Sequence, residues 1–336
     1  MPKKFYDRFY NFIRKNFKLI IIYAVLICFF TIPLDYEIYT PGGLINLTER
    51  IHIDNNSKSE KGSFNLTYVG AKKGIIPMIL LSYVFPNWDL VDIDDLRIDD
   101  EDYEQIAARG KIDLETVNQT AIAVAFETAQ IPYKIKSYDV VVYHVFNTAK
   151  TNLKVGDIIK QVNNKSVNSL EELKIDLQNY NIDDEVKFTI IRDDEELEVN
   201  GIIYEENGEK LIGLYLQVMI TVDTDIKVEF EYNANEQGSS GGLMSALEIY
   251  NNITDFDLTK GNIISGTGTI NLDGTVGEIA GVKYKLAGAV RNGANVFICP
   301  AANYEEAIKE KEKNNYEIEI IKAINFKNVV KQLKER

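Results

Sequence analysis

An uncharged apolar stretch near the N-terminus restricts the fold of this chain more than any other feature. It runs over Leu19–Leu34 (LIIIYAVLICFFTIPL) and approaches the ~20 residues that a helix needs to cross the hydrocarbon core of a bilayer. Basic residues precede the stretch and acidic residues follow it, a bias that predicts a cytoplasmic N-terminus. The basic residues are Lys3, Lys4, Arg8, Arg14, Lys15 and Lys18, and the acidic ones are Asp35 and Glu37.

A cleavable signal peptide is the main alternative to a membrane anchor. Such a peptide needs a small-residue cleavage site of the A-x-A kind, and the residues after Phe29 offer none. A buried core helix is disfavoured by the basic residues that precede the stretch. The sequence therefore predicts an uncleaved, single-pass anchor within residues 1–35, with the N-terminus cytoplasmic and the remaining chain outside the cell membrane.

Composition excludes several classes of function. With 37 basic and 51 acidic residues the net charge is −14, which repels nucleic-acid phosphates over most of the surface. The two cysteines, Cys28 and Cys299, lie far apart and show no disulfide or metal framework. With only His52 and His144, a zinc site or a Ser-His-Asp triad has few side chains to draw on. We therefore expect no metal, no cofactor and no nucleic-acid partner.

Residues 36–135 form an N-terminal extracytoplasmic segment to which the sequence assigns no role. Alternating apolar and polar residues predict strands in its first part, and residues 113–130 have the apolar spacing of an amphipathic helix. Between them, Asp89–Glu104 is rich in carboxylates but lacks the glycine and closing glutamate of an EF-hand loop. This pattern favours a solvated loop over a calcium site.

Residues 136–205 have the pattern of a compact β-rich module. A strand (YDVVVYHVF) is followed by the phrase LKVGDII, a helix and a hairpin around Asp193-Asp194. Ser169 is the expected cap of that helix, and Glu172 completes a capping box. His144 lies on the first strand without an acid or nucleophile near it in the sequence, so we expect a structural role for it.

This order of elements resembles a PDZ domain of the type found in bacterial proteases. The resemblance implies that the module binds extended peptide ends by adding them to the edge of a sheet. Asp139 and Asn152 stand where glycines are expected. The sequence therefore leaves open whether the module has a working groove for a peptide carboxylate.

A glycine- and serine-rich turn, residues 238–242 (GSSGG), precedes an apolar helix pattern, LMSALEIYNNI. Small residues let the backbone turn tightly and leave the Ser240 hydroxyl exposed at the start of a helix. Free N–H groups and the positive end of the helix dipole stabilise an oxyanion at that place. Taken alone, the turn is equally typical of a serine that only caps a helix.

A second glycine-rich segment supplies a candidate base. Residues 266–276 predict a hairpin with an Asp-Gly turn, and a helix follows from Val282 to the glycine at 293. Lys285 lies on that helix beside apolar neighbours. Partial desolvation there lowers the pKa of a lysine, which then accepts a proton from a serine hydroxyl. The alternative is that Lys283 and Lys285 are solvated surface charges.

Residues 212–300 resemble the proteolytic domain of Lon, the S16 serine protease family, and the closest match is to the membrane-anchored PDZ-domain Lon-like proteases of bacteria. The resemblance depends on an ordered series: G-x-S-x-G before LMSALEIYN, then DLTKGNIISGTGTINLDGTVGEIAGV, then K-x-K. It implies Ser240 as nucleophile, Lys285 as catalytic lysine and Thr267 as the threonine that supports the lysine. It also implies an oxyanion hole made by the backbone N–H groups around Ser239 and Ser240.

The chain departs from the family at the nucleophile, where P-S-A-G is usual. Ser239 replaces the proline and Gly241 replaces the alanine. Ser239 is therefore a competitor for the nucleophile, and Lys283 is the alternative base.

The resemblance implies an α+β multidomain protein with an N-terminal transmembrane helix, a PDZ-like module and a Lon-type α/β proteolytic domain over residues 206–336. Its implied activity is that of a serine endopeptidase with a Ser-Lys dyad. The chain lacks the Walker A pattern G-x-x-x-x-G-K-[ST], so we expect ATP-independent cleavage of extended or exposed segments of extracytoplasmic proteins or peptides. Lon domains assemble in rings, which leaves a homo-oligomer open. The alternative function is a non-catalytic, membrane-anchored PDZ scaffold with a degenerate Lon-like domain.

Overall fold

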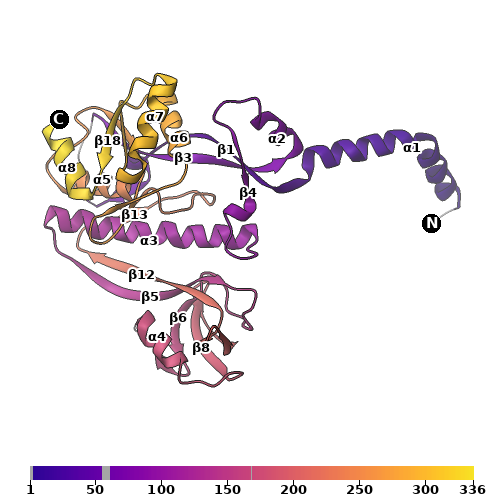
Figure 1. Ribbon diagram of the computed structural model, residues 1–336, viewed down its shortest axis with the longest axis horizontal. Helices are drawn as coiled ribbons and strands as arrows, with labels where there is room; N and C mark the ends of the chain where they lie inside the picture. The colour runs from indigo at the N-terminus through magenta and orange to yellow at the C-terminus, as the bar shows by residue number, and fades with distance from the viewer. Residues whose placement is uncertain (1–2, 55–60, 168) are drawn as a thin grey trace. The chain divides into compact units, whose positions relative to one another are not determined.

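The computed structural model describes residues 3–54, 61–167 and 169–336 (Figure 1). The chain divides into two compact units. The first contains the chain up to Pro41 together with Val69–Leu96, and the second contains Gly42–Tyr68 and Arg97–Arg336. The long strands β1 (Pro33–Asn46) and β3 (Ser63–Ile75) each contribute residues to both units.

The first unit holds the N-terminal helix and a small β pair. Helix α1 (Lys3–Thr31) contacts α2 (Ile76–Ser82), which has a proline in its first turn. The N-terminal part of β1 pairs antiparallel with β4 (Asp89–Asp92), which leads into the 3-10 turn η2 (Ile93–Asp95).

The transmembrane anchor expected within residues 1–35 is not supported. Helix α1 ends at Thr31 and Pro33 begins β1, so the helical part of the apolar stretch is Leu19–Thr31. That part is about 20 Å long at 1.5 Å per residue, whereas the hydrocarbon core of a bilayer is about 30 Å thick. Among the residues that the structure describes, no helix is both long enough and apolar enough to cross a membrane.

The second unit contains a parallel sheet in the strand order β18-β17-β14-β3. Strand β3 pairs parallel with β14 over Ser63–Leu66, so the N-terminal part of the sequence completes this C-terminal sheet. Bulky side chains such as Phe64 and Phe297 are fully buried in its core. The remaining elements are β14 (Ile263–Gly266), β17 (Val296–Pro300), η3 (Ala301–Asn303), β18 (Glu319–Ala323), α5 (Gly242–Ile253), α6 (Val282–Arg291), α7 (Tyr304–Asn314) and α8 (Phe326–Glu335).

Two short antiparallel strand pairs complete this part of the unit. The expected hairpin after residue 266 is confirmed, because β15 (Thr269–Ile270) pairs antiparallel with β16 (Val276–Gly277). Strand β2 (Ile51–Ile53), which follows the turn η1 (Leu47–Glu49), pairs with β13 (Val228–Phe230). The latter pairing again joins the expected N-terminal segment to residues beyond the expected boundary at 205.

An antiparallel sheet with its own core forms the other part of the second unit. Its strand order is β12-β5-β6-β8-β9, and its buried side chains include Val140, Phe188 and Ile190. Ser169 caps α4 as expected, because its side chain accepts the N–H of Glu172 at 3.1 Å. The elements are β5 (Tyr133–Val145), β6 (Ile158–Val162), β7 (Lys165–Ser166), α4 (Leu170–Leu177), β8 (Glu185–Arg192), β9 (Glu195–Ile202), β10 (Tyr204–Glu206), β11 (Glu209–Leu211) and β12 (Leu214–Thr224).

Strand β12 shifts the expected boundary between modules. It pairs with β5 from Leu214 to Thr224, so the sheet of the expected 136–205 module extends well past residue 205. A local pattern of hydrophobicity does not reveal this pairing, because about seventy residues separate the end of β5 from the start of β12.

Helix α3 (Tyr103–Ala129) belongs to both parts of the second unit. It begins earlier than the expected helix over residues 113–130, and Asp102 and Gln105 form a capping box at its start. Ile112 packs with residues of β5 and β12, whereas Val117 and Phe126 join the core that contains α5. Residues 36–135 are therefore not a separate segment but are divided among these cores.

Candidate active site

Ser240 lies in a short loop, Gly238–Gly241, which we call the serine loop and which leads directly into α5. Gly238 has a φ of +92°, a left-handed conformation that residues other than glycine rarely adopt. The N–H of Gly242 donates to the carbonyl of Ser239 at 3.2 Å. Ser240 is half-buried. The predicted tight turn before a helix is therefore confirmed.

The first residue of α5 is packed so closely that only glycine fits. A Cβ on Gly242 would lie 2.3 Å from the Val117 side chain of α3 and 2.8 Å from the side chain of Ile270. The serine loop is therefore fixed at its C-terminal end by direct packing of α5 on α3.

Hydrogen bonds join Lys285, Thr267 and the serine loop. The Nζ of Lys285 donates to Thr267 Oγ1 at 3.0 Å, and the Thr267 hydroxyl donates to the carbonyl oxygen of Ser240 at 3.1 Å. The N–H of Gly268 donates to the same carbonyl at 2.8 Å. The structure therefore brings together the residues that the resemblance implies as nucleophile, base and supporting threonine.

The surroundings of Lys285 favour its neutral form. Its side chain is carried by α6 and the residue is 4% exposed. Burial lowers the pKa of its ammonium group from 10.5 to about 8. A fraction of Lys285 is therefore neutral near pH 7 and able to accept a proton. The burial predicted for this lysine is confirmed, and its catalytic role stays a prediction.

We next compare the alternative base, Lys283, and the alternative nucleophile, Ser239, with Lys285 and Ser240. Lys283 is half-buried, and its amine lies over the ring of Tyr284, 4.8 Å from the ring centre. Ser239 is half-buried like Ser240, so exposure does not separate the two hydroxyls. Thr267, the partner of Lys285, bonds to the backbone carbonyl of Ser240.

The start of α5 also offers candidate oxyanion donors. In the described part of the chain, the structure gives no backbone acceptor for the N–H groups of Ser239 and Ser240. N–H groups at a helix start stabilise negative charge that develops on a nearby oxygen. The site thus has the hydroxyl, amine and backbone donors that acyl transfer requires.

Comparison with protein families agrees with this arrangement. Residues 112–202 match the PDZ domain family. Residues 215–335 match the Lon protease (S16) C-terminal proteolytic domain. The chain therefore carries a PDZ domain followed by a Lon-type proteolytic domain, and the latter contains Ser240, Thr267 and Lys285.

One curated relative supports the assignment of the Lon-type domain. The chain is similar to the peroxisomal Lon protease homolog 2 of Caenorhabditis elegans, with 32% identity over 109 residues. The match covers 32% of this chain and 14% of the length of that relative.

Solved PDZ domains are also similar to part of the chain. The PDZ domain of an SdrC-like protein from Listeria monocytogenes has 20% identity and a TM-score of 0.23, covering 25% of this chain and 92% of that domain. The corresponding domain from Listeria innocua has 21% identity and a TM-score of 0.22, covering 23% of this chain and 92% of that domain.

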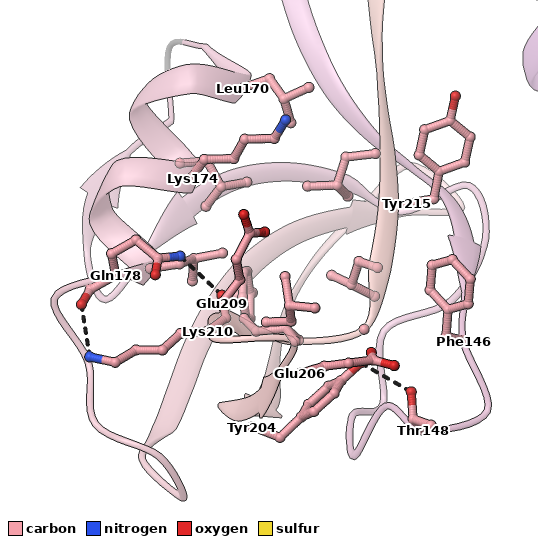
Figure 2. Close-up of a pocket in the computed structure, with 18 of the residues that line it drawn as sticks. Phe146, Thr148, Leu170, Lys174, Gln178, Tyr204, Glu206, Glu209, Lys210 and Tyr215 are labelled. Carbon is pink, nitrogen blue, oxygen red and sulfur yellow. Dashed lines mark hydrogen bonds between the residues drawn. The ribbon is translucent and has the colours of Figure 1, made fainter.

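The PDZ domain contains a groove of 1060 Å³ between α4 and the start of β12 (Figure 2). Leu170 and Leu177 of α4 and Leu214 of β12 are among its apolar lining residues. At one end, Lys210 of β11 donates to the carbonyl of Gln178 at 3.0 Å, and the Gln178 amide donates back to the carbonyl of Lys210 at 3.0 Å. The hairpin β10–β11 is thereby fastened to the C-terminal end of α4.

The sequence did not reveal a buried cluster of polar and charged side chains at the start of α3. Glu101, expected in a solvated loop, is 3% exposed. Its carboxylate binds Arg109 at 2.9 and 3.1 Å and lies 2.9 Å from Nδ1 of His144. Burial alone raises the pKa of Glu101, but hydrogen bonds from Arg109, the N–H of Ile98 and His144 hold it below its ordinary value. The capping box at Asp102 is the sequence signal that marks this helix start.

The same cluster accounts for the burial of His144 in the PDZ sheet. His144 is 1% exposed, and its ring also packs edge-on against Phe146. This environment agrees with the structural role that the sequence predicts for it. Among the described residues, no group of three or more His, Cys, Asp or Glu is placed to hold a metal ion.

Proposed function

We propose that this chain is a serine endopeptidase in which neutral Lys285 removes the proton from the Ser240 hydroxyl. The observation that carries the proposal is the buried amine of Lys285 bonded to Thr267, whose hydroxyl is bonded in turn to the backbone of Ser240. A lysine amine held in an apolar site beside a loop serine is the arrangement that activates a hydroxyl without histidine.

The reaction follows from these groups. Ser240 Oγ attacks the carbonyl carbon of the scissile peptide bond as its proton passes to Lys285 Nζ. The N–H groups of Ser239 and Ser240 donate hydrogen bonds to the carbonyl oxygen and stabilise the negative charge that develops on it. Each such donor is worth about 3–4 kcal/mol in the transition state. Lys285 then returns its proton to the leaving amine. In the second step Lys285 takes a proton from the water that attacks the acyl-enzyme, and it gives that proton to Ser240 Oγ as the ester bond breaks.

Thr267 has a positioning role in this scheme. Its hydroxyl hydrogen is directed to the Ser240 carbonyl, so its oxygen lone pair is left to accept from Lys285. It therefore holds the amine next to the serine loop without competing for the proton that Lys285 must accept.

The substrates that suit such a site are extended chains. We propose that cleavage is ATP-independent and acts on unfolded or exposed segments, because the chain carries no Walker A pattern. The PDZ groove is suited to hold an extended segment of the substrate or of a partner along the start of the edge strand β12.

The surface of α1 supports a membrane location, which would give the protein substrates outside the cytoplasm. Apolar side chains project to solvent from the second half of α1, including Ile22, Leu26 and Phe30. A helix that is apolar all round requires an apolar environment, such as lipid. We propose that α1 attaches the protein to the cell membrane, with the proteolytic domain on the extracytoplasmic side.

The proposal is tested by incubating the full chain with fluorescein-labelled, unfolded casein and comparing two variants. Ser240→Ala and Lys285→Ala are each expected to lower kcat/KM at least ~10²–10⁴-fold. Ser239→Ala and Lys283→Ala are the matched controls, because they alter the neighbouring serine and lysine and are expected to keep most activity. If a control loses as much kcat/KM as the variant it is matched with, the chemistry lies on other residues.

The alternative is a peptide-binding scaffold without catalysis, which the groove of the PDZ domain favours. It predicts that the unaltered chain binds a peptide tail yet cleaves no unfolded protein.

A further inference from the structure

The end of α2 and the turn that follows it expose a cluster of apolar side chains, which we call the α2 patch. Tyr83 and Val84 are 78% and 72% exposed, whereas Ser82 beside them is buried. Single exposed apolar residues are common on soluble proteins, but a contiguous cluster marks an interaction surface. The α2 patch consists of Leu80, Leu81, Tyr83, Val84 and Phe85.

The backbone under the α2 patch forms its hydrogen bonds within the patch itself. The N–H groups of Val84 and Phe85 both donate to the carbonyl of Leu81 at 3.0 Å. The Ser82 hydroxyl donates to the carbonyl of Ile79 at 2.7 Å. Backbone groups that enter lipid must be satisfied internally, because the hydrocarbon supplies no partners. The α2 patch meets this requirement in the turn where its most exposed side chains lie.

A tryptophan and a lysine lie at the border of the α2 patch. The ring of Trp88 packs against Phe85 with the ring centres 5.0 Å apart, and the amine of Lys72 lies 5.6 Å from the centre of the Trp88 ring. Tryptophan and lysine side chains favour the boundary between lipid and water, because each has an apolar body and a polar tip. The patch therefore has the apolar centre and the border that a bilayer surface requires.

The α2 patch is continuous with the apolar surface of α1. A Cβ on Gly74 of β3 would lie 2.6 Å from the carbonyl oxygen of Tyr36 of β1, so these strand ends lie side by side. Strand β1 follows α1 closely and α2 follows β3 directly, which brings the two helices into contact. Figure 1 shows α2 close to the C-terminal end of α1, where Leu26 and Phe30 are exposed.

We propose that the α2 patch is a second lipid-binding surface, which enters the bilayer on which α1 is held. The inference rests on the proposed attachment of α1 to the membrane and commits to one partner, a bilayer that contains anionic phospholipid. Interfacial elements reach about 5–10 Å into the boundary between head groups and acyl chains. Tyr83 and Val84 lie in that layer, and Trp88 and Lys72 lie at the level of the head groups.

A second contact with lipid restrains the first unit. Only Ile32 separates the last residue of α1 from the first residue of β1, and α1 by itself leaves rotation about this link open. Contact through the α2 patch fixes the direction in which β1 and β3 leave the surface. Because α1 brings the patch to the bilayer, the contribution of the patch is measured with α1 intact.

The test uses Trp88, which is the only tryptophan of the sequence, as a probe in the full chain. Its fluorescence is recorded with vesicles of phosphatidylcholine and phosphatidylglycerol, and with the same vesicles containing phosphatidylcholine brominated near the top of its acyl chains. Bromine quenches tryptophan only on contact. The emission is expected to shift to shorter wavelength on binding and to be quenched by the brominated lipid.

Acidic substitutions in the α2 patch separate its contribution from that of α1. Tyr83→Asp/Val84→Asp is expected to lower the affinity for these vesicles at least ~10-fold, because two apolar side chains no longer enter the lipid. At saturating lipid it is expected to sediment through α1 but to lose the quenching of Trp88. Ile175→Asp/Ile182→Asp is the matched control, since it adds two carboxylates at exposed apolar positions of the PDZ domain.

The lysine at the border tests the preference for anionic lipid. Lys72→Gln is expected to weaken sedimentation with phosphatidylglycerol vesicles about 5-fold and to leave binding to pure phosphatidylcholine unchanged. Lys150→Gln, which removes an exposed lysine from the PDZ domain, is the matched control and is expected to bind like the unaltered chain.

The outcomes distinguish this inference from the proposals on which it rests. Sedimentation of the unaltered chain without quenching of Trp88 would overturn the α2 patch as a lipid surface and leave attachment by α1 in place. Failure of the unaltered chain to sediment would remove both. A blue shift that grows with protein concentration without lipid would assign the patch to a second copy of the chain. Quenching in a chain that cleaves no casein would support the lipid surface and count against the protease.

Discussion

At the scale of single residues, Lys285 has the most consequential position in the molecule. It lies in a site that is nearly closed to water, and its amine donates to the hydroxyl of Thr267. Holding the charged form there costs free energy, which is why burial lowers the pKa to about 8. The burial on which the proposed catalysis depends should therefore weaken the fold at neutral pH.

Replacing Lys285 by methionine separates these two effects. Lys285→Met is expected to abolish cleavage and to raise the free energy of unfolding at pH 7 by about 1–3 kcal/mol, because a buried charge is removed. Urea unfolding followed by circular dichroism measures the change. Lys283→Met is the control, since that lysine is half-buried over a tyrosine ring and its loss should leave stability nearly unchanged.

The pH dependence of cleavage should report the same group. In the proposed mechanism only neutral Lys285 accepts the proton of Ser240, so kcat/KM is expected to rise with pH and to level off above about 8. A profile of casein cleavage between pH 5.5 and 9.5 tests this. A rising limb near pH 6 would instead point to a histidine or carboxylate as the base.

Stability should rise over a higher range of pH. Between the folded pKa of about 8 and the ordinary value of 10.5, the unfolded chain keeps a proton on Lys285 that the folded chain has lost. The unfolded state binds more protons there, so the free energy of unfolding increases with pH across that window. The unfolding midpoint of Ser240→Ala should show this increase and that of Lys285→Met should not.

At the scale of elements, α3 is the helix on which both parts of the second unit depend. Ile112 packs on the PDZ sheet, Val117 packs on the start of α5, and the cluster of Glu101, Arg109 and His144 fastens the N-terminal end of α3 to β5. The placement of the serine loop is consequently a property of how α3 is held.

Loss of the carboxylate at Glu101 tests that dependence. Glu101→Ala leaves the guanidinium of Arg109 partly buried without this partner, and breaking a buried pair typically costs about 3–5 kcal/mol. Thermal unfolding is expected to begin at a lower temperature, with casein cleavage reduced in the folded protein. Glu104→Ala, at an exposed position one turn along, is the control. An unchanged midpoint would contradict a structural role for the cluster.

At the scale of the whole molecule, α1 is the element that carries the proposed contact with a membrane. The helical part of the apolar stretch in α1 is shorter than a bilayer core, yet its side chains are exposed. An interfacial or inserted helix of this composition binds lipid through its apolar residues and is assisted by its basic flank.

Vesicle sedimentation tests the proposed attachment. The full chain is expected to sediment with vesicles of phosphatidylcholine and phosphatidylglycerol, and the double variant Ile22→Asp/Leu26→Asp is expected to remain in the supernatant. Ile175→Asp, at an exposed apolar position on α4, is the control and should sediment like the unaltered chain. Equal sedimentation of all three would assign lipid binding to another surface.

The sequence by itself determined the local units of this protein. Some features depend only on neighbouring residues and can be predicted from the sequence. They are the turn at Gly238, the hairpin after residue 266 and the N-cap of α4. The order of the motifs was also enough to nominate Ser240, Thr267 and Lys285, and the structure brings these residues together.

Only the tertiary structure decided which distant segments complete each core. Thr67 of β3 donates to the carbonyl of Gly266 at 2.8 Å across 199 residues of sequence, and β12 joins the PDZ sheet although it lies beyond the expected boundary. Burial of Glu101 likewise requires partners from α3 and β5. Such pairings are chosen by burial and hydrogen bonding among whole elements, which a local pattern of residues does not encode.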